Sequence, residues 1–278
     1  MSKRATTMST AIVIMALLCG SLAAAPARQL RVCADPNNLP FSNERGEGFE
    51  NKIAAILADE LGASLHYTWW AQRRGFVRNT LKDGRCDLLI GVPGQFELAS
   101  TTAPYYRSSY VFVYRKDRND RIDSFDAPAL RKLKIGVHLI GDDYANTPPA
   151  HALSGRNIIH NVVGFTIYGD YREPDPPARI IDALAAGEID VAVVWGPLAG
   201  FFAPRAAVAL EFVPVAPQVE QGVPPMAFDI AMAVRHGDGG FRQEIEAAIG
   251  RRRADIDAVL AAYGVPQAPA RARPGEAK

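Results

Sequence analysis

Four residues of types that commonly bind metals lie close together in the middle of the chain. They are the histidines His138 and His151 and the acidic pair Asp142-Asp143. Imidazole nitrogens and carboxylate oxygens are typical zinc ligands, but this spacing fits no established metal-binding pattern. Pro148-Pro149 also interrupts any helix that could align the side chains. We therefore predict a surface position for these residues and no metal site.

The sequence lacks the motifs of the common enzyme classes. It has no G-x-S-x-G nucleophile turn, no G-x-x-x-x-G-K phosphate loop, no H-E-x-x-H and no paired C-x-x-C. Each of these motifs supplies a reactive or ligand-binding group in a defined local structure. We predict a protein that is not an enzyme and that carries no cofactor.

Two sequence patterns each occur twice, with the same offset of 103 residues. Leu30–Ala34 resembles Leu133–Val137, and Leu81–Ile90 resembles Leu184–Val193. In the second pair a helix ends, a glycine caps it, an aspartate follows and a buried strand begins. We predict two α/β lobes of similar build, with mainly parallel sheets and a cleft between them.

The cleft residues can be predicted from the topology, because open α/β sheets bind ligands beyond the carboxyl ends of their strands. Tryptophan, proline and glycine dominate there and charges are few, which suits a peptide or a weakly polar aromatic ligand better than a zwitterion. For Trp69 the better prediction is the core. The predicted cleft residues are Asp35, Pro36, Asn38, Phe41, Trp70, Gln72, Arg73, Arg74, Gly91, Pro93, Gln95, Asp142, Asp143, Tyr144, Trp195, Gly196 and Pro197.

The N-terminus has the layout of a secretory signal. Lys3 and Arg4 precede an apolar run over 11–18, and small residues follow up to Ala27, so cleavage before Arg28 is expected. The run is far shorter than the roughly 20 residues that span a bilayer. Its removal would change the formal net charge from +1 to −1, and the chain has no basic run, which argues against a nucleic-acid partner.

The two cysteines beyond this signal are Cys33 and Cys86. Both lie at or beside predicted strands that could be neighbours, and an exported chain permits a disulfide. Free cysteines are also common in protein cores. The sequence leaves a bridge and two free thiols equally open.

Several short motifs are spread over the first part of the chain, namely Pro40-Phe41-Ser42, Gly48-Phe49-Glu50, Leu61-Gly62, Gly84 to Gly91 and Pro104-Tyr105-Tyr106. They resemble the first lobe of periplasmic solute-binding proteins of the amino-acid type (family 3), and the resemblance covers nearly all of the mature chain. It implies a type 2-like fold in which two crossing strands join the lobes around a cleft. It also implies a periplasmic location.

A narrower resemblance rests on longer motifs in the second half, namely Ile135 to Leu153, Tyr168-Gly169-Asp170-Tyr171 and Trp195-Gly196-Pro197-Leu198-Ala199-Gly200. These motifs are similar to those of the solute-binding-like proteins associated with quinoprotein methanol dehydrogenases. That family implies an accessory role in activating or maturing a dehydrogenase that carries pyrroloquinoline quinone (PQQ), with this dehydrogenase as partner and no catalytic residues.

The chain departs from the amino-acid binders at both halves of their carboxylate site. Those proteins usually carry an arginine before the Pro-Tyr-Tyr motif, which clamps the ligand carboxylate. Here Gln95 stands at that position, and in the second lobe Asp142-Asp143 would repel a carboxylate. These departures argue against an ordinary amino-acid receptor.

Two functions remain in view. The first is an accessory protein of a PQQ-dependent methanol dehydrogenase, and the second is the receptor of an ABC importer for a small organic ligand other than a standard amino acid. For both we expect a monomer when the protein is free. The predicted division is a signal over 1–27, the first lobe over 28–113, the second over 114–225, a return to the first over 226–264, and a flexible tail over 265–278.

Overall fold

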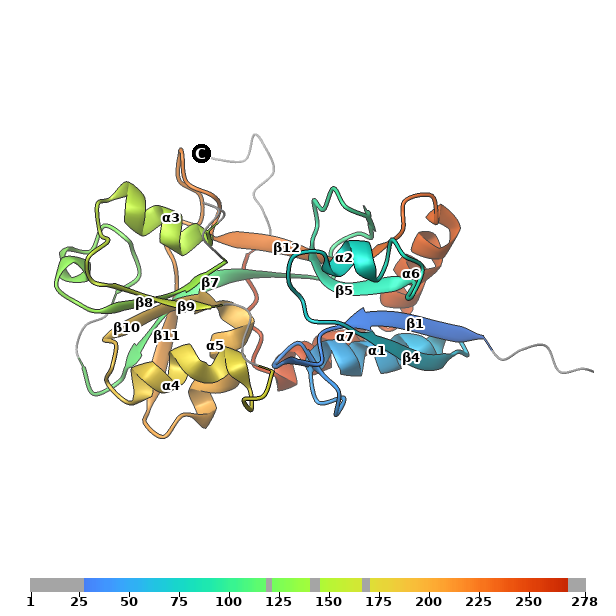
Figure 1. Cartoon of the computed structure of the whole chain (residues 1–278), viewed down its shortest axis with the longest axis horizontal. Coiled ribbons are helices and arrows are strands. Elements are labelled where there is room, and N and C mark those ends of the chain that lie inside the picture. The colour runs from blue at the N-terminus through green and yellow to red at the C-terminus, as the bar shows by residue number, and fades with distance from the viewer. Residues whose placement is uncertain (1–27, 119–121, 141–145, 167–170, 270–278) are drawn as a thin grey trace, which may run out of the picture.

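The computed structural model describes residues 28–118, 122–140, 146–166 and 171–269, so the predicted signal lies outside the described residues. The chain forms two α/β lobes, and the strands β7 (Tyr106–Arg115) and β12 (Ala227–Val234) run antiparallel between them (Figure 1). Within the described ranges, no helix has the length and apolar character needed to cross a membrane.

The first lobe is built on the sheet β4-β1-β5-β12, in which β1 pairs in parallel with both β4 and β5. Helix α1 buries Phe49, Ile53 and Leu57, whose spacing of four residues places them on one helix face. This face packs against the sheet together with α6 and α7. The elements of this lobe are β1 (Gln29–Ala34), β2 (Asn37–Asn38), β3 (Ser42–Asn43), α1 (Phe49–Glu60), β4 (Ser64–Trp69), α2 (Phe76–Asn79), β5 (Leu88–Pro93), β6 (Ser100–Thr101), α6 (Gly239–Arg251) and α7 (Arg253–Ala262).

The second lobe continues the sheet from β7 in the order β10-β8-β9, with β11 also paired to β7. Two hydrophobic clusters cover its two faces. Helices α4 and α5 contribute to one, and α3 contributes to the other. The elements are β8 (Ile135–Leu139), α3 (Pro148–Gly155), β9 (Val162–Thr166), α4 (Arg179–Ala185), β10 (Val191–Trp195), α5 (Gly196–Phe202) and β11 (Leu210–Pro214), with 3-10 turns at Pro128–Arg131, Pro176–Ala178 and Ala203–Arg205.

The two lobes share one strand register, as the sequence repeat predicts. Val32 lies opposite Leu88 between β1 and β5, and Ile135 lies opposite Val191 between β8 and β10, so both residues of the pair are displaced by the repeat offset. The aspartates that precede β5 and β10 also make equivalent backbone hydrogen bonds. The amide of Asp87 donates to the carbonyl of Arg31, and the amide of Asp190 donates to that of Lys134.

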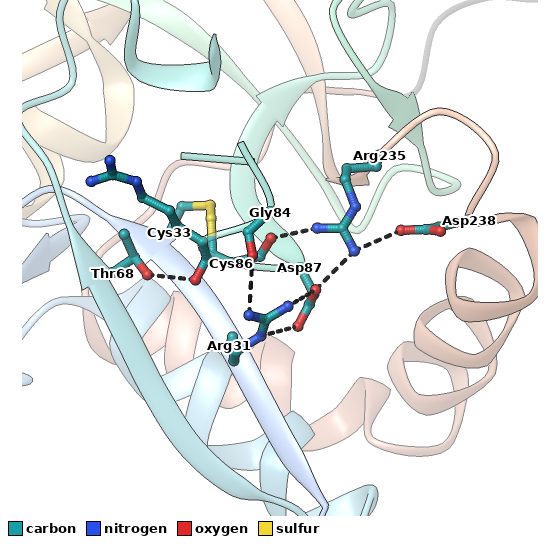
Figure 2. A network of polar contacts seen from close by, with 9 residues as sticks. Arg31, Cys33, Thr68, Gly84, Cys86, Asp87, Arg235 and Asp238 are labelled. Carbon is teal, nitrogen blue, oxygen red and sulfur yellow. Dashed lines mark hydrogen bonds and ion pairs between the residues drawn. A yellow bond between two sulfur atoms is a disulfide. The ribbon is translucent and has the colours of Figure 1, made fainter. Parts of the chain in front are cut away.

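A polar network and a disulfide hold the outer end of the first lobe together (Figure 2). The Asp87 carboxylate accepts two hydrogen bonds from the Arg31 guanidinium, at 2.6 and 2.7 Å, and one from Arg235 at 2.9 Å. Next to it, Cys33 and Cys86 form a disulfide with their Cα atoms 5.4 Å apart. Of the two alternatives that the sequence left open, the structure contains the bridge.

The predicted domain boundaries fall at places where elements are shared. Strand β7 pairs with β12 over Tyr106–Ser109 and with β10 from Tyr110 onward, so this one strand belongs to both lobes. The division at residue 113 lies within it and stays a prediction. The predicted flexible tail from residue 265 needs correction at its start. Val265 is buried, and the Ser108 hydroxyl and the Arg107 carbonyl bind the backbone of residues 266 and 268.

Candidate functional site

A cavity of about 470 Å³ lies between the two lobes. Its walls come from the loops at the carboxyl ends of the strands, from the first turn of α1 and from the two crossing strands. The lining is mainly aromatic and aliphatic, and the described residues contribute neither lysine nor arginine to it. The lining residues are Asp35, Asn37, Asn38, Phe41, Glu50, Gln72, Gly91, Pro93, Tyr106, Tyr110, His138, Ile140, Thr147, Tyr171, Pro177, Trp195, Leu198, Phe228 and Ile230.

Asp35 follows directly after β1 and is only 3% exposed. Its carboxylate accepts hydrogen bonds from the backbone amides of Asn37, at 2.9 Å, and Gln72, at 2.6 Å. A third hydrogen bond comes from the Tyr171 hydroxyl at 2.7 Å. These donors belong to the loop after β1, the loop after β4 and the second lobe, so one carboxylate ties together three segments at the mouth of the cavity.

Two further contacts cross between the lobes at this edge. The Asn37 side-chain amide donates to the backbone carbonyl of Glu173 at 2.9 Å. The Arg73 guanidinium lies over the ring of Tyr171, 5.2 Å from its centroid. The lobes are therefore closed over the cavity on the side of Asp35.

Glu50 is the second carboxyl group of the cavity and lies in the first turn of α1. Gly91, with φ +78°, makes room for it, because a Cβ at that position would overlap Oε1 of Glu50. Within the described residues the Glu50 carboxyl has no hydrogen-bond partner. Burial, with a further contribution from the charge of Asp35, raises the pKa of Glu50 to about 8.

Aromatic rings of the crossing strands and of β10 form one wall. The Trp195 ring lies edge-on to Tyr110, with centroids 5.4 Å apart, and to Phe228, with centroids 5.9 Å apart. Burial raises the pKa of the Tyr106 and Tyr110 hydroxyls above the usual range, so both stay neutral. This wall presents ring faces and edges without charge.

His138 reaches the cavity from β8 and is 7% exposed. Burial lowers its pKa to about 4, so the imidazole is neutral at physiological pH. The Thr147 hydroxyl donates to the backbone carbonyl of His138 at 2.7 Å. The predicted surface position of His138 is therefore wrong, because β8 runs through the sheet and carries this side chain inward. The described residues contain no group of three or more potential ligands that could hold a metal.

The structure brings together part of the predicted cleft. Seven of the predicted residues line the cavity, and they come from the segments after β1 and β4, from β5 and from the last residue of β10. These residues are Asp35, Asn38, Phe41, Gln72, Gly91, Pro93 and Trp195.

The other described residues of the predicted set lie outside the lining, namely Pro36, Trp70, Arg73, Arg74, Gln95, Gly196 and Pro197.

Local packing explains several of these positions. Trp70 is exposed, with the guanidinium of Arg85 5.6 Å from its ring centroid. Gly196 and Pro197 begin α5 and are buried against β7, where a Cβ at Gly196 would lie 2.7 Å from the carbonyl oxygen of Ser109. Asp142, Asp143 and Tyr144 lie outside the described residues.

The sequence analysis did not predict most of the cavity-lining residues of the second lobe or those of the two crossing strands. A rule based on strand ends finds loops, whereas Tyr106, Tyr110 and Phe228 lie within strands that pass between the lobes. The prediction of crossing strands could have supplied them, because such strands must form the floor of the cleft. The lining residues outside the predicted set are Asn37, Glu50, Tyr106, Tyr110, His138, Ile140, Thr147, Tyr171, Pro177, Leu198, Phe228 and Ile230.

Comparison with known proteins gives full-length relatives, although no family model matches the chain. The chain is 32% identical to Protein MoxJ of Paracoccus denitrificans over 270 residues, which cover 91% of this chain and 94% of that protein. It is 31% identical to Protein MoxJ of Methylorubrum extorquens over 254 residues, covering 87% and 83% of the two chains.

Solved structures agree with this relationship. The periplasmic binding protein XoxJ from Methylobacterium extorquens AM1 is 38% identical, with a TM-score of 0.71 over 87% of this chain and 100% of that one. MxaJ from Methlophaga aminisulfidivorans MPT is 27% identical, with a TM-score of 0.73 over 86% and 100%. An ancestral cationic amino acid solute-binding protein, 20% identical with a TM-score of 0.65 over 85% and 95% of the two chains, shares the fold. The predicted type 2-like periplasmic binding protein fold is confirmed.

Proposed function

Because this chain belongs to the MoxJ family of periplasmic binding proteins, as its sequence motifs indicate, we propose that it is a non-catalytic accessory factor of a PQQ-dependent methanol dehydrogenase. In this role it binds the dehydrogenase in the periplasm, after export and removal of its signal, and promotes activation or maturation of that enzyme. The observation that carries the proposal is the relationship to MoxJ, which extends over 91% of the chain.

The cavity supports this role over that of an amino-acid receptor. The amino-acid binders clamp the ligand carboxylate with an arginine, yet the described lining offers the acidic residues Asp35 and Glu50 and no lysine or arginine. Gln95, which stands where the amino-acid binders carry their arginine, is exposed and outside the lining. A large, mainly apolar cavity with an aromatic wall suits a segment of a protein partner.

Deletion of the gene tests the accessory role. We expect the deletion strain to lose most alcohol-dependent dehydrogenase activity while it still synthesises PQQ. Re-expression of the wild-type protein restores the activity, and we expect a Trp195→Ala variant to restore less, because truncation of an aromatic anchor commonly costs about 2 kcal/mol of binding. Normal dehydrogenase activity in the deletion strain would falsify the accessory role.

The variant needs its own control, because Trp195 also packs against Tyr110 and Phe228. Its thermal midpoint and its abundance in the periplasm must be measured beside the activity. A variant that is folded, abundant and fully active would show that the partner docks elsewhere. Co-purification of the wild-type protein with the inactive dehydrogenase gives a direct test of the partner.

One observation favours a second function, the receptor of an ABC importer. Hydrogen bonds between the lobes close the cavity, as they do in proteins that enclose a small ligand. Neighbouring permease and ATPase genes would favour this function, whereas dehydrogenase and cytochrome c genes would favour the first. Under either function we expect standard amino acids to bind no more tightly than roughly millimolar, measured by calorimetry.

A further inference from the structure

The Glu50 carboxyl lies in the wall of the cavity and accepts no hydrogen bond from any described residue. Its carboxyl is enclosed by protein on most sides and partly accessible from the cavity. Gly91 leaves the space that the carboxyl occupies. Asp35 differs, since its oxygens already accept three hydrogen bonds. Glu50 is therefore free to bind a ligand.

The surroundings of Glu50 favour a positively charged ligand. The described lining contains two acidic residues and no lysine or arginine, and His138 stays neutral. The rest of the wall is aromatic, with Trp195, Tyr110 and Phe228 in mutual contact. Aromatic faces attract cations, and the attraction is larger where water is excluded.

We propose that the cavity binds an alkylammonium group, with Glu50 as its anionic partner and the aromatic wall around its alkyl chain. The ammonium donates hydrogen bonds to the Glu50 carboxylate, and its chain lies against the rings. A free alkylamine and the side chain of a partner's lysine share this chemistry. The inference goes beyond the accessory role and does not depend on it.

Binding should release a proton. Besides burial, the charge of Asp35, after β1, raises the pKa of Glu50, and the charge of Glu50 in turn raises the pKa of Tyr67 on β4, of Tyr105 and of Tyr106 on β7. His138 reaches the same cavity from β8. The tyrosines and His138 are neutral near pH 7, where most Glu50 side chains still carry a proton, so a bound cation drives the release of that proton. Alkylammonium ions stay charged to about pH 10, by analogy with lysine. Their apparent affinity should therefore rise about tenfold per pH unit below about pH 8 and level off above it.

Isothermal titration calorimetry of the purified protein with three probes of similar size tests the charge requirement. The probes are n-butylammonium, butanol and butyrate. At about pH 8.5 we expect butylammonium to bind at least tenfold more tightly than butanol, and butyrate to bind most weakly. Titration at about pH 7 in two buffers of different ionisation enthalpy should show release of nearly one proton per bound butylammonium.

The Glu50→Gln variant tests the assigned residue, because it keeps the shape and removes the charge. We expect butylammonium to bind at least tenfold more weakly to it at about pH 8.5, with no pH dependence and unchanged butanol binding. The matched control is Glu44→Gln, an exposed acid on the same segment and outside the lining, which should bind as the wild type does.

Three results would overturn the inference. They are equal affinity for butylammonium and butanol, no proton release by the wild type, and a folded Glu50→Gln variant with wild-type affinity. The wild-type measurements decide the matter even if the variant does not fold. If the inference holds, binding of Nα-acetyl-lysine methylamide distinguishes a free alkylamine from the lysine side chain of a partner as the ligand. If it binds like butylammonium the cavity accepts a lysine side chain, and if it fails while butylammonium binds the cavity accepts a free amine.

Discussion

Asp35 and Glu50 show how two carboxyl groups of one cavity acquire different properties. Asp35 accepts hydrogen bonds from two backbone amides and one tyrosine hydroxyl, all of which favour a carboxylate. Glu50 lies beside this charge, enclosed by protein and without such donors among the described residues. Its pKa of about 8 follows from burial first and from Asp35 second. The folded protein therefore holds a proton on Glu50 that the unfolded chain would release.

This difference predicts a specific pH dependence of stability for Glu50→Gln. The folded-state pKa of Glu50 is about 8, above the ordinary glutamate value of 4.5, so the wild type loses stability as the pH rises through this interval. The variant lacks this loss. Relative to the wild type, we expect the free energy of unfolding of the variant to rise by at most about 1.4 kcal/mol per pH unit between about pH 5 and 8. Urea unfolding of both proteins across this range measures the gain.

The comparison isolates Glu50, because His138 and all other titrating groups are present in both proteins. A difference between the two unfolding free energies that stays constant with pH would mean that Glu50 titrates normally in the folded state.

Individual cavity residues differ in whether the sequence alone could predict them. Asp35 and Trp195 could be predicted, because Asp35 directly follows β1, Trp195 is the last residue of β10, and strand ends converge at the cleft. Glu50 could not, because its place depends on how α1 packs and on the positive φ of Gly91. Neither feature leaves a local pattern in the sequence.

At the scale of elements, the close packing of α5 against the C-terminal segment depends on two glycines. A Cβ at Gly200 would overlap the carbonyl oxygen of Gly264, which follows α7. We expect Gly200→Ala to lower the free energy of unfolding by about 1–3 kcal/mol, although alanine favours a helix, because the backbones must move apart. Thermal or urea unfolding measures this effect.

Gly250→Ala is the matched control for this substitution. Gly250 lies inside α6, and a Cβ there would meet no atom within 4 Å. Here alanine should stabilise the protein by about 0.5–1 kcal/mol, since only the helix propensity changes. If both substitutions stabilise the protein, the close approach at Gly200 is not tight in solution.

The two lobes differ in the contact that joins one pair of equivalent repeat positions. Cys33 and Cys86 form the disulfide of the first lobe, and Gly136 and Ile189 stand at the same places of the repeat in the second. In the second lobe a Cβ at Gly136 would overlap the Ile189 side chain. Packing of Ile189 against Gly136 therefore takes the place that the disulfide has in the first lobe. The repeat predicted the shared strands, but this local difference depends on side-chain packing.

The disulfide should contribute substantially to the stability of the first lobe. It joins residues separated by 53 positions, and such a link restricts the unfolded chain. We expect the double variant Cys33→Ala/Cys86→Ala to lose about 2–4 kcal/mol of unfolding free energy. Wild type unfolded in urea with a reductant is the control and should show a similar loss, whereas an unchanged urea midpoint in both would mean that the bridge does not form.

At the scale of the whole molecule, the repeat predicted two lobes of similar build, and the family resemblance implied the crossing strands between them. The sequence alone did not predict that the lobes would be closed. Closure depends on a few polar contacts between segments far apart in sequence, such as Asn37 with Glu173 and Asp35 with Tyr171. Such pairs have no periodicity that a single sequence could reveal.

These contacts predict that Tyr171→Phe opens the molecule. Its hydroxyl donates to the Asp35 carboxylate at 2.7 Å, and a hydrogen bond to a charged group is worth about 1.5–3 kcal/mol. That loss can change the ratio of open to closed molecules by tenfold or more. We expect a larger radius of gyration by small-angle X-ray scattering and faster amide exchange in the loop after β1. Tyr67→Phe is the control, because its hydroxyl bonds to Asn51 within the first lobe and its loss should leave the shape unchanged. A Tyr171→Phe variant as compact as the wild type would show that packing rather than this hydrogen bond holds the lobes together.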